Sequence, residues 1–136
     1  MTPRKRISVA LVGLIALVVI GWLVRDYAGT GESSPPGATE SGLQVQRMSA
    51  LPPEVATTWK SITEGGPFRY PGKDGTVFGN REDLLPQRPS GYYREYTVPT
   101  PGSPDRGARR LVTGESSEIY YTGDHYESFV VVDPDE

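Results

Sequence analysis

The polarity of the chain changes twice, and these changes divide it into three segments. Residues 1–27 begin with the basic sequence Arg4-Lys5-Arg6 and continue as an uncharged, mostly apolar run from Ile7 to Val24. As a helix this run would span about 27 Å, close to the thickness of the hydrocarbon core of a bilayer. A domain this small could not bury such a helix on every side. The segment therefore predicts a signal anchor or transmembrane helix, with a cleaved signal peptide as the alternative.

The second segment, residues 28–42, contains mainly Gly, Ser, Thr, Pro and Glu, and no aliphatic residue larger than Ala. Such a composition cannot bury enough apolar surface to offset the entropy lost on ordering, so it predicts a flexible linker. The folded domain is then expected at residues 43–136. We expect this domain to be exported, and either anchored to the cell membrane or secreted if the first segment is cleaved.

One helix is predicted near the start of this domain. Pro52-Pro53-Glu54 is typical of a first helical turn, and Gly65-Gly66-Pro67 ends the pattern. Val55, Trp59 and Ile62 are spaced by four and three residues, which places them on one apolar stripe.

After residue 67 the pattern changes to short runs of β-branched and aromatic residues separated by Gly, Pro and Asp. These runs predict strands at residues 76–78, 92–98, 109–113, 119–121 and 128–133. One helix followed by several strands predicts an α+β domain, with the helix packed on a twisted antiparallel sheet.

The strand at residues 92–98 carries a carboxylate in its middle. Because side chains alternate between the two faces, Tyr93, Glu95 and Thr97 are predicted to share one face. A buried, unpaired carboxylate is costly, so Glu95 is either solvated on an open face or held against an arginine.

Composition narrows the chemistry further. The chain has no cysteine and one histidine, His125, which excludes disulfides, thiol nucleophiles and two-histidine metal sites. Its net charge is −3, and residues 43–136 carry ten basic against fourteen acidic side chains. This balance disfavours a general nucleic-acid binder, so an anion site must be a local cluster of arginines.

The candidate chemical groups are Glu95, His125 and the run Arg106-Gly-Ala-Arg109-Arg110. Each of these groups, taken alone, also fits a role without catalysis. Glu95 could be an ion-pair partner, His125 a surface histidine and the arginine run a solvated turn. Together they supply a base, an acid and cations that match phosphate oxygens, which are the groups needed for transesterification of an RNA phosphodiester. DNA lacks the 2′-hydroxyl that would attack the phosphorus.

These residues lie in three of six sequence blocks that together resemble the small guanyl-specific ribonucleases secreted by bacteria, of the streptomycete kind and distantly related to barnase. The blocks are Ser49-Ala-Leu-Pro-Pro-Glu54, Asp74-Gly-Thr-Val-Phe-Gly-Asn-Arg-Glu82, Leu85-Pro86, Gly91-Tyr-Tyr-Arg-Glu-Tyr-Thr-Val98, Arg106-Gly-Ala-Arg-Arg110 and Tyr120-Tyr-Thr-Gly-Asp-His-Tyr126. The resemblance extends from residue 51 to residue 133 and implies the microbial ribonuclease fold.

The resemblance also implies a metal-independent endoribonuclease that cleaves single-stranded RNA 3′ of guanosine through a 2′,3′-cyclic phosphate, without a cofactor. Glu95 matches the general base and His125 the general acid. Arg106 and Arg110 match the phosphate clamp, and Tyr126 is expected to contact the same phosphate.

The guanine site is implied at residues 78–82. Glu82 would accept hydrogen bonds from the base, and the backbone amides of Asn80 and Arg81 would donate to its carbonyl oxygen. Phe78 would stack on the base, a contact usually worth about 1–3 kcal/mol. Arg81 and Tyr93 are expected to line the same cleft.

Two departures from the family pattern affect these expectations. Gly79 stands where the streptomycete relatives carry an amide side chain, which predicts a looser guanine loop. The disulfide of those relatives cannot form here, so we expect lower stability. The resemblance further implies a monomer with a barstar-like inhibitor as partner. The alternative function is a surface-tethered domain that binds RNA, nucleotides or protein without turnover.

Overall fold

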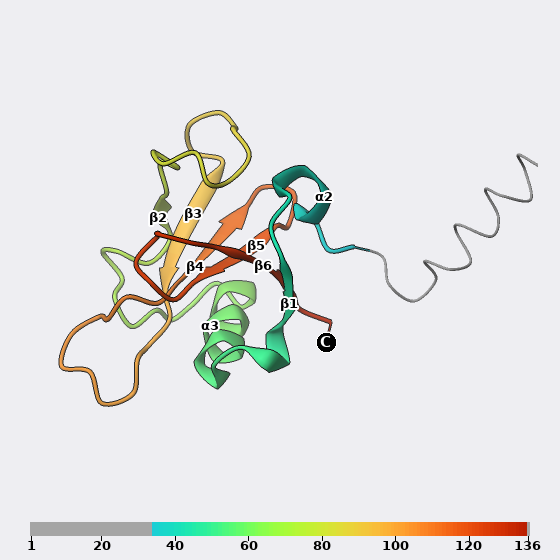
Figure 1. The fold of residues 1–136 in the computed structure, drawn as a ribbon. Helices are drawn as coiled ribbons and strands as arrows, with labels where there is room; N and C mark the ends of the chain where they lie inside the picture. Colours follow the sequence, from blue (N-terminus) through green and yellow to red (C-terminus); the bar gives the residue numbers. More distant parts are fainter. Residues whose placement is uncertain (1–33, 136) are drawn as a thin grey trace, which may run out of the picture. The chain divides into compact units, whose positions relative to one another are not determined.

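The structure is a computed structural model that describes residues 34–135 (Figure 1). Its elements are, in chain order, helix α2 (Ala38–Ser41), strand β1 (Val45–Arg47), 3-10 helix η1 (Met48–Ala50), helix α3 (Pro53–Thr63), and strands β2 (Thr76–Val77), β3 (Tyr93–Thr97), β4 (Arg110–Gly114), β5 (Ile119–Thr122) and β6 (Val130–Asp133). The α+β class predicted from the sequence is confirmed. The five predicted strands correspond to β2 to β6, with ends that differ by at most two residues.

The six strands form one sheet in the order β1-β6-β5-β4-β3-β2. Neighbours from β6 to β2 pair antiparallel, but β1 pairs parallel with β6, with Val45 opposite Val131. The expectation of a purely antiparallel sheet is therefore wrong at this edge. β1 was not predicted because its three residues, Val-Gln-Arg, are too few to show an alternating pattern.

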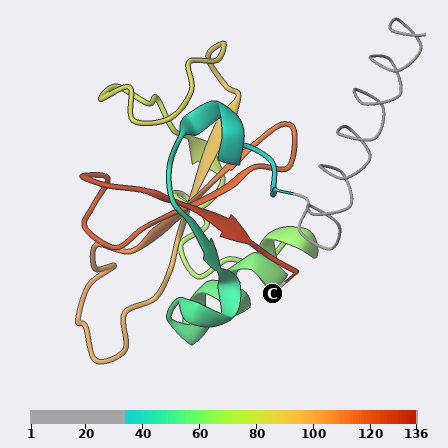
Figure 2. The ribbon, with the colours of Figure 1, turned by 45° about the vertical axis from the view of Figure 1, so that its right-hand side comes forward.

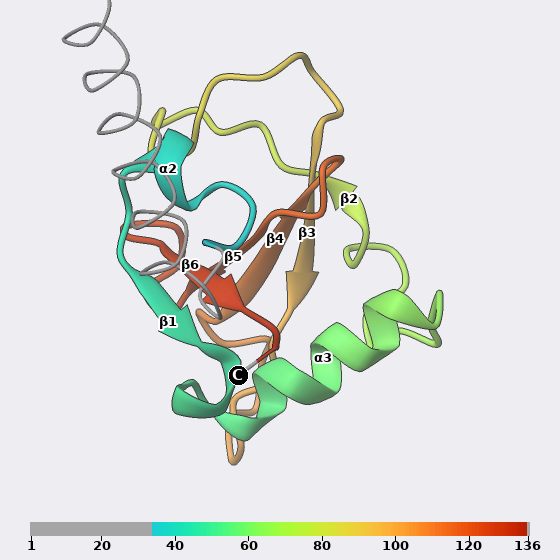
Figure 3. The ribbon, with the colours of Figure 1, turned by 90° about the vertical axis from the view of Figure 1, so that its right-hand side faces the viewer.

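Helix α3 covers one face of the sheet and lies beside the C-terminal end of β3, where Thr58 donates a hydrogen bond to the Thr97 carbonyl (Figure 3). It begins with Pro53 in the first turn, and after Thr63 the chain turns through two glycines with positive φ. Val55 is fully buried, and Trp59 and Ile62 pack against the same core cluster, which confirms the predicted stripe. The cluster also contains Met48, Val98, Leu111, Ile119 and Val132.

The opposite face of the sheet carries a second core cluster, formed by Leu85, Tyr93, Val112, Tyr120, Phe129 and Val131. Within residues 34–135, no long helix covers this face. It is covered instead by α2 and by the loops that leave β2 and β5, and Figure 2 shows the long loops before and after β3 at opposite ends of that strand. Polar side chains can therefore reach the sheet surface between these loops.

Residues 34–42 belong to the folded unit, although the sequence suggested a linker up to residue 42. Ala38 packs against the second core cluster, and Glu40 forms an ion pair with Arg88 of the β2–β3 loop. The helix could not be predicted from the composition of this segment, because α2 has only four residues and buries none of them. The folded unit thus begins near residue 34 rather than residue 43.

The predicted anchor at residues 1–27 lies outside the described residues. From residue 34 to residue 135, no helix has the length and apolar character needed to cross a bilayer.

Candidate functional site

Glu95 lies on the sheet face opposite α3. The strand register places it beside Val112, which in turn pairs with Tyr120. The Glu95 side chain is 20% exposed, and its Oε1 atom accepts a hydrogen bond of 3.0 Å from the Tyr126 hydroxyl and lies 4.0 Å from Nη2 of Arg106. Of the two arrangements left open by the sequence, the structure shows the carboxylate held beside an arginine.

Two arginines of the predicted clamp approach the same surface from the β3–β4 loop and the start of β4. Nε of Arg106 donates to Oγ1 of Thr97 at 3.0 Å. Arg110 is 3% exposed, and its Nη1 donates to the carbonyl oxygens of Gly107 and Arg109 at 2.9 and 2.7 Å.

Each of the two guanidinium groups has a donor atom that forms no hydrogen bond within residues 34–135. Among residues 34–135, Nη2 of Arg106 and Nε of Arg110 are buried and have no hydrogen-bond partner. A buried cationic donor without an acceptor costs free energy, so an oxyanion bound here would satisfy both groups.

The turn between β5 and β6 presents His125 and Tyr126. Both residues have positive φ, 56° and 72°, an uncommon conformation for non-glycine residues that is concentrated at functional sites. The His125 amide donates to the carbonyl of Ala108, and the Tyr126 amide donates to Oγ1 of Thr122, both at 3.0 Å. These bonds hold the backbone of the turn against Ala108, and the exposed His125 ring lies 4.9 Å from that of Tyr126.

Tyr126 joins the catalytic candidates to the neighbouring pocket. Burial raises the pKa of its phenol, and the adjacent Glu95 carboxylate adds to this rise. Tyr126 therefore remains a neutral hydrogen-bond donor to Glu95 at physiological pH. Its ring stacks on Phe78, with centroids 5.2 Å apart.

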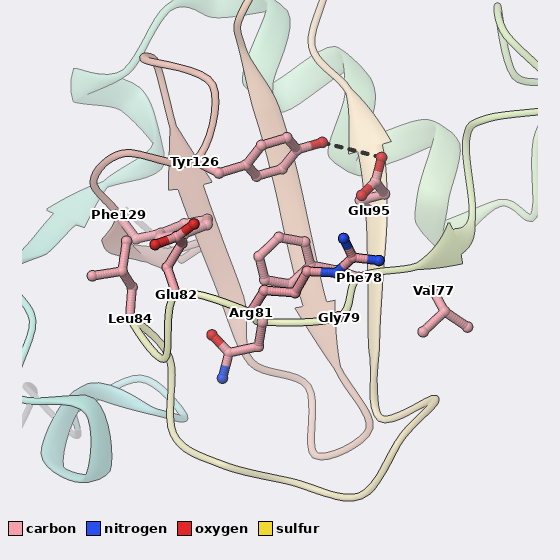
Figure 4. Close-up of a pocket in the computed structure, with 10 residues that line it drawn as sticks. Val77, Phe78, Gly79, Arg81, Glu82, Leu84, Glu95, Tyr126 and Phe129 are labelled. Atoms are coloured by element: carbon pink, nitrogen blue, oxygen red, sulfur yellow. Dashed lines mark hydrogen bonds between the residues drawn. The ribbon is translucent and has the colours of Figure 1, made fainter.

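The pocket has a volume of about 310 Å³ and is lined by Val77, Phe78, Gly79, Asn80, Arg81, Glu82, Leu84, Glu95, Tyr126 and Phe129 (Figure 4). In this view Phe78 lies between Glu82 and Glu95. An aromatic floor with a carboxylate at each side can accommodate a flat, hydrogen-bonding ligand next to the Glu95 carboxylate.

The backbone of the pocket loop is shaped by Asn80. Its φ is 50°, and its side chain donates to the Leu85 carbonyl at 2.9 Å and accepts from the Leu85 amide at 3.1 Å. The Asn80 side chain therefore holds the loop closed, so a ligand in the pocket would be contacted by the backbone of Asn80 and not by its side chain. The role expected for the backbone amides of residues 80 and 81 stays a prediction.

The structure brings most of the predicted residues together but separates Tyr93 from them. Tyr93 is 3% exposed, donates its hydroxyl to the Pro86 carbonyl and does not line the pocket. Burial raises the pKa of Tyr93 to about 12. Its ring packs edge-on against Phe78, so it supports the pocket floor instead of lining the cleft.

The sequence interpretation missed Val77, Leu84 and Phe129 as pocket residues. Phe129 is buried and packs edge-on against Phe78. In the sequence it could be interpreted only as a core residue of the strand predicted at residues 128–133. Leu84 is 37% exposed, and an exposed leucine in a loop carries no specific signal.

Gly79 has room for a side chain. Its φ lies outside the left-handed region, and an added Cβ would meet the Arg81 side chain at 3.6 Å, an ordinary contact. We expect Gly79→Ala to raise the free energy of unfolding by about 0.4–1 kcal/mol and to lower the Kd for guanosine 3′-phosphate, because the unliganded loop loses conformational freedom. Chemical denaturation and nucleotide titration measure the two effects.

The matched control is Gly72→Ala, which also lies in an exposed loop with open space around it but outside this pocket. It is expected to stabilise the protein without changing nucleotide affinity. Weaker nucleotide binding in Gly79→Ala than in Gly72→Ala would contradict the interpretation of a loosened loop.

Comparison with known proteins identifies the family. The sequence model of the ribonuclease family matches residues 34–133. The chain therefore belongs to the ribonuclease family, and the predicted resemblance to guanyl-specific microbial ribonucleases is confirmed.

Among the relatives is guanyl-specific ribonuclease St of Saccharopolyspora erythraea, 55% identical over 96 residues that cover 71% of this chain and 93% of the relative. Guanyl-specific ribonuclease Sa of Kitasatospora aureofaciens is 55% identical over 87 residues, covering 63% and 90% of the two chains. A crystal structure of ribonuclease Sa2 with guanosine-2′-cyclophosphate matches with a TM-score of 0.64 and 46% identity, covering 68% of this chain and 97% of the other.

Proposed function

We propose that the protein is a guanyl-specific endoribonuclease that cleaves single-stranded RNA 3′ of guanosine. The observation that carries this proposal is the junction at Glu95, where one carboxylate contacts the Tyr126 hydroxyl, lies 4.0 Å from Arg106 and lines the Phe78 pocket. A proton acceptor, an anion site and a pocket for a flat ligand therefore meet at one point. The relatives are named guanyl-specific ribonucleases, which supports RNA cleavage as the reaction and guanine as the recognised nucleobase.

In the first step, Glu95 takes the proton of the guanosine 2′-hydroxyl while that oxygen attacks the adjacent phosphorus. The bond from phosphorus to the 5′-oxygen of the next nucleotide breaks, and the His125 imidazolium donates a proton to this leaving oxygen. Arg106 and Arg110 stabilise the charge that develops on the phosphoryl oxygens, using the donors without hydrogen-bond partners described above.

The product of this step is a 2′,3′-cyclic phosphate. In the second step, neutral His125 removes a proton from water and the water oxygen bonds to phosphorus. The bond between phosphorus and the 2′-oxygen breaks, and protonated Glu95 returns its proton to that oxygen, which leaves a 3′-phosphate. The solved complex of ribonuclease Sa2 with guanosine-2′-cyclophosphate supports a cyclic phosphate as the ligand of this family's site.

Guanine selectivity is assigned to the loop from Phe78 to Glu82. The Glu82 carboxylate accepts hydrogen bonds from the N1 and exocyclic amino groups of the base, and the amides of Asn80 and Arg81 donate to its carbonyl oxygen. Adenine presents the opposite pattern at these positions and leaves the carboxylate without a donor. Support comes from Glu82 lining the pocket and from Asn80 using its side chain to hold the loop.

The test is cleavage of the dinucleotides GpA and ApA by the purified protein. GpA is expected to yield guanosine 2′,3′-cyclic phosphate first and guanosine 3′-phosphate later, and ApA is expected to remain largely intact. Equal cleavage of both, or tight binding of GpA without turnover, would overturn the proposal, and the second result would favour a binding domain.

Metal removal is a separate prediction. Because side chains supply both proton transfers and the cationic charge, an excess of EDTA is expected to leave the initial rate on GpA unchanged. Within residues 34–135, no three His, Cys, Asp or Glu side chains cluster in a way that could hold a metal ion. Loss of activity in EDTA that returns with added magnesium would contradict the mechanism.

Export and inhibition complete the proposal. We propose that the active domain acts outside the cytoplasm, delivered by residues 1–27, and that the producing cell is protected by a barstar-like inhibitor.

A further inference from the structure

The segment that precedes β1 packs against the loop that carries the residues assigned to guanine. We call residues 35–42, which comprise α2 and its flanking glycines, the strap. The β2–β3 loop extends from Phe78 to Tyr92, and its first part lines the pocket of Figure 4, here called the guanine pocket. Ala38 of the strap packs into the same core cluster as Phe78 and Leu85 of the loop. The strap and the floor of the guanine pocket therefore share one packed core.

Gly37 allows the strap to lie very close to the sheet. Its φ is 86°, a conformation that favours glycine. A Cβ added at this position would collide with the Tyr120 hydroxyl and lie 3.2 Å from Cγ of Glu118. Both of these side chains are buried. The sequence thus places a glycine where the strap must touch two buried side chains of β5 and the turn before it.

Arg88 connects the strap to the β2–β3 loop. Its Nη2 atom forms an ion pair with the Glu40 carboxylate of the strap, and its Nη1 atom donates to the Gln87 carbonyl at 3.2 Å. Its guanidinium group lies 5.5 Å from the centre of the Tyr92 ring, whose hydroxyl donates to Oε2 of the buried Glu118 at 2.7 Å. Arg88 is therefore held between a fixed aromatic ring and the carboxylate of Glu40.

A restraint on Arg88 reaches the part of the loop that lines the guanine pocket. The Asn80 side chain bonds both backbone groups of Leu85, at 2.9 and 3.1 Å, so these two ends of the recognition segment move together. Arg88 follows Leu85 by three residues. Gly79, within the recognition segment, gives the backbone additional freedom. The ion pair of Arg88 with Glu40 limits the motion that this freedom allows.

We propose that the strap positions the β2–β3 loop for guanine recognition, with Glu40 acting through Arg88 to hold the loop in the conformation that binds the base. This inference rests on the proposed function. Glu40 is a positioning residue, because it does not line the guanine pocket. The apparent Kd of a ligand rises as the fraction of protein in the binding conformation falls, so loss of the ion pair weakens binding without altering the chemical groups of the site.

The test measures the Kd of guanosine in the purified full chain by calorimetric titration. Guanosine carries no phosphate, so its affinity reports base recognition and is insensitive to long-range changes of charge. Glu40→Gln is expected to raise this Kd about two- to fivefold, the range for an exposed ion pair. The KM for GpA is expected to rise while kcat stays unchanged. Hydrogen exchange of the backbone amides of residues 80–92 is expected to become faster in the same variant.

The matched control is Glu64→Gln, which removes the same charge from an exposed position at the end of α3, outside the guanine pocket. Its Kd and its hydrogen exchange at residues 80–92 are expected to match the wild type. A second comparison uses Arg88→Gln, in which Glu40 has lost its ion-pair partner. In that background, Glu40→Gln is expected to have no further effect on the Kd.

Two results would overturn the inference. One is a Glu40→Gln protein whose Kd and exchange rates equal those of Glu64→Gln. The other is an effect of Glu40→Gln that persists in full when Arg88 is already replaced. The proposed function fails separately, if the wild-type protein does not cleave GpA.

Discussion

Replacing Glu95 with glutamine is expected to lower kcat on GpA by about 10²–10⁴-fold. The amide has nearly the same shape and its oxygen can still accept the hydrogen bond from the Tyr126 hydroxyl, but it cannot take the proton of the 2′-hydroxyl. Initial rates measured across the pH range test this directly. The wild-type profile is expected to be bell-shaped, and the variant is expected to lose the rise on its acidic side.

Binding separates this effect from damage to the pocket. The Glu95→Gln variant is expected to bind guanosine 3′-phosphate with nearly wild-type affinity, since the loop that recognises the base is intact. Glu115→Gln is the matched control, because Glu115 is exposed in the β4–β5 turn and does not line the guanine pocket. If Glu95→Gln retained activity comparable to that control, Glu95 would not be the base.

Replacing His125 is expected to have an effect of similar size, again about 10²–10⁴-fold on GpA. The 5′-oxygen of a nucleoside is a poor leaving group and needs a proton as its bond to phosphorus breaks. An ester of guanosine 3′-phosphate with p-nitrophenol needs no such proton. The variant is therefore expected to retain much more of its activity on the aryl ester than on GpA.

The backbone at His125 guides the choice of variant. With φ at 56°, alanine would be strained by about 1–2 kcal/mol, whereas asparagine tolerates this conformation. His125→Asn removes the acid with little change in the turn, and His125→Ala adds the strain. Both are expected to show the same selective loss on GpA, and equal losses on GpA and the aryl ester would argue against His125 as the acid.

Much of this site could be predicted from the sequence because strands alternate strictly. The pattern of residues 92–98 placed Glu95 on the face with Thr97, and the observed register confirms that face. Only one histidine was available, which limited the choice of acid. Arg106 and Arg110 were named by resemblance, and the structure adds that each has one buried donor without a hydrogen-bond partner in the described part of the chain.

Other features could not be predicted because they depend on tertiary packing. Tyr93 shares a face with Glu95, yet the loop from Phe78 to Pro86 covers it, and alternation alone does not reveal such a cover. Helix α2 and strand β1 have four and three residues, so their stability comes from contacts with distant segments and not from local pattern. The ion pair of Glu40 with Arg88 is one such contact, between residues 48 positions apart.

The two outer strands of the sheet have a consequence for association between molecules. β1 contains three residues and β2 only two, and each exposes one valine, Val45 or Val77, with about 45% of its surface accessible. Another chain can add a strand to an exposed apolar sheet edge. Such pairing needs a longer run of unpaired amides and carbonyls than either edge of this sheet has. The short length of β1 and β2 thus protects both edges of the sheet from the addition of a strand by another molecule.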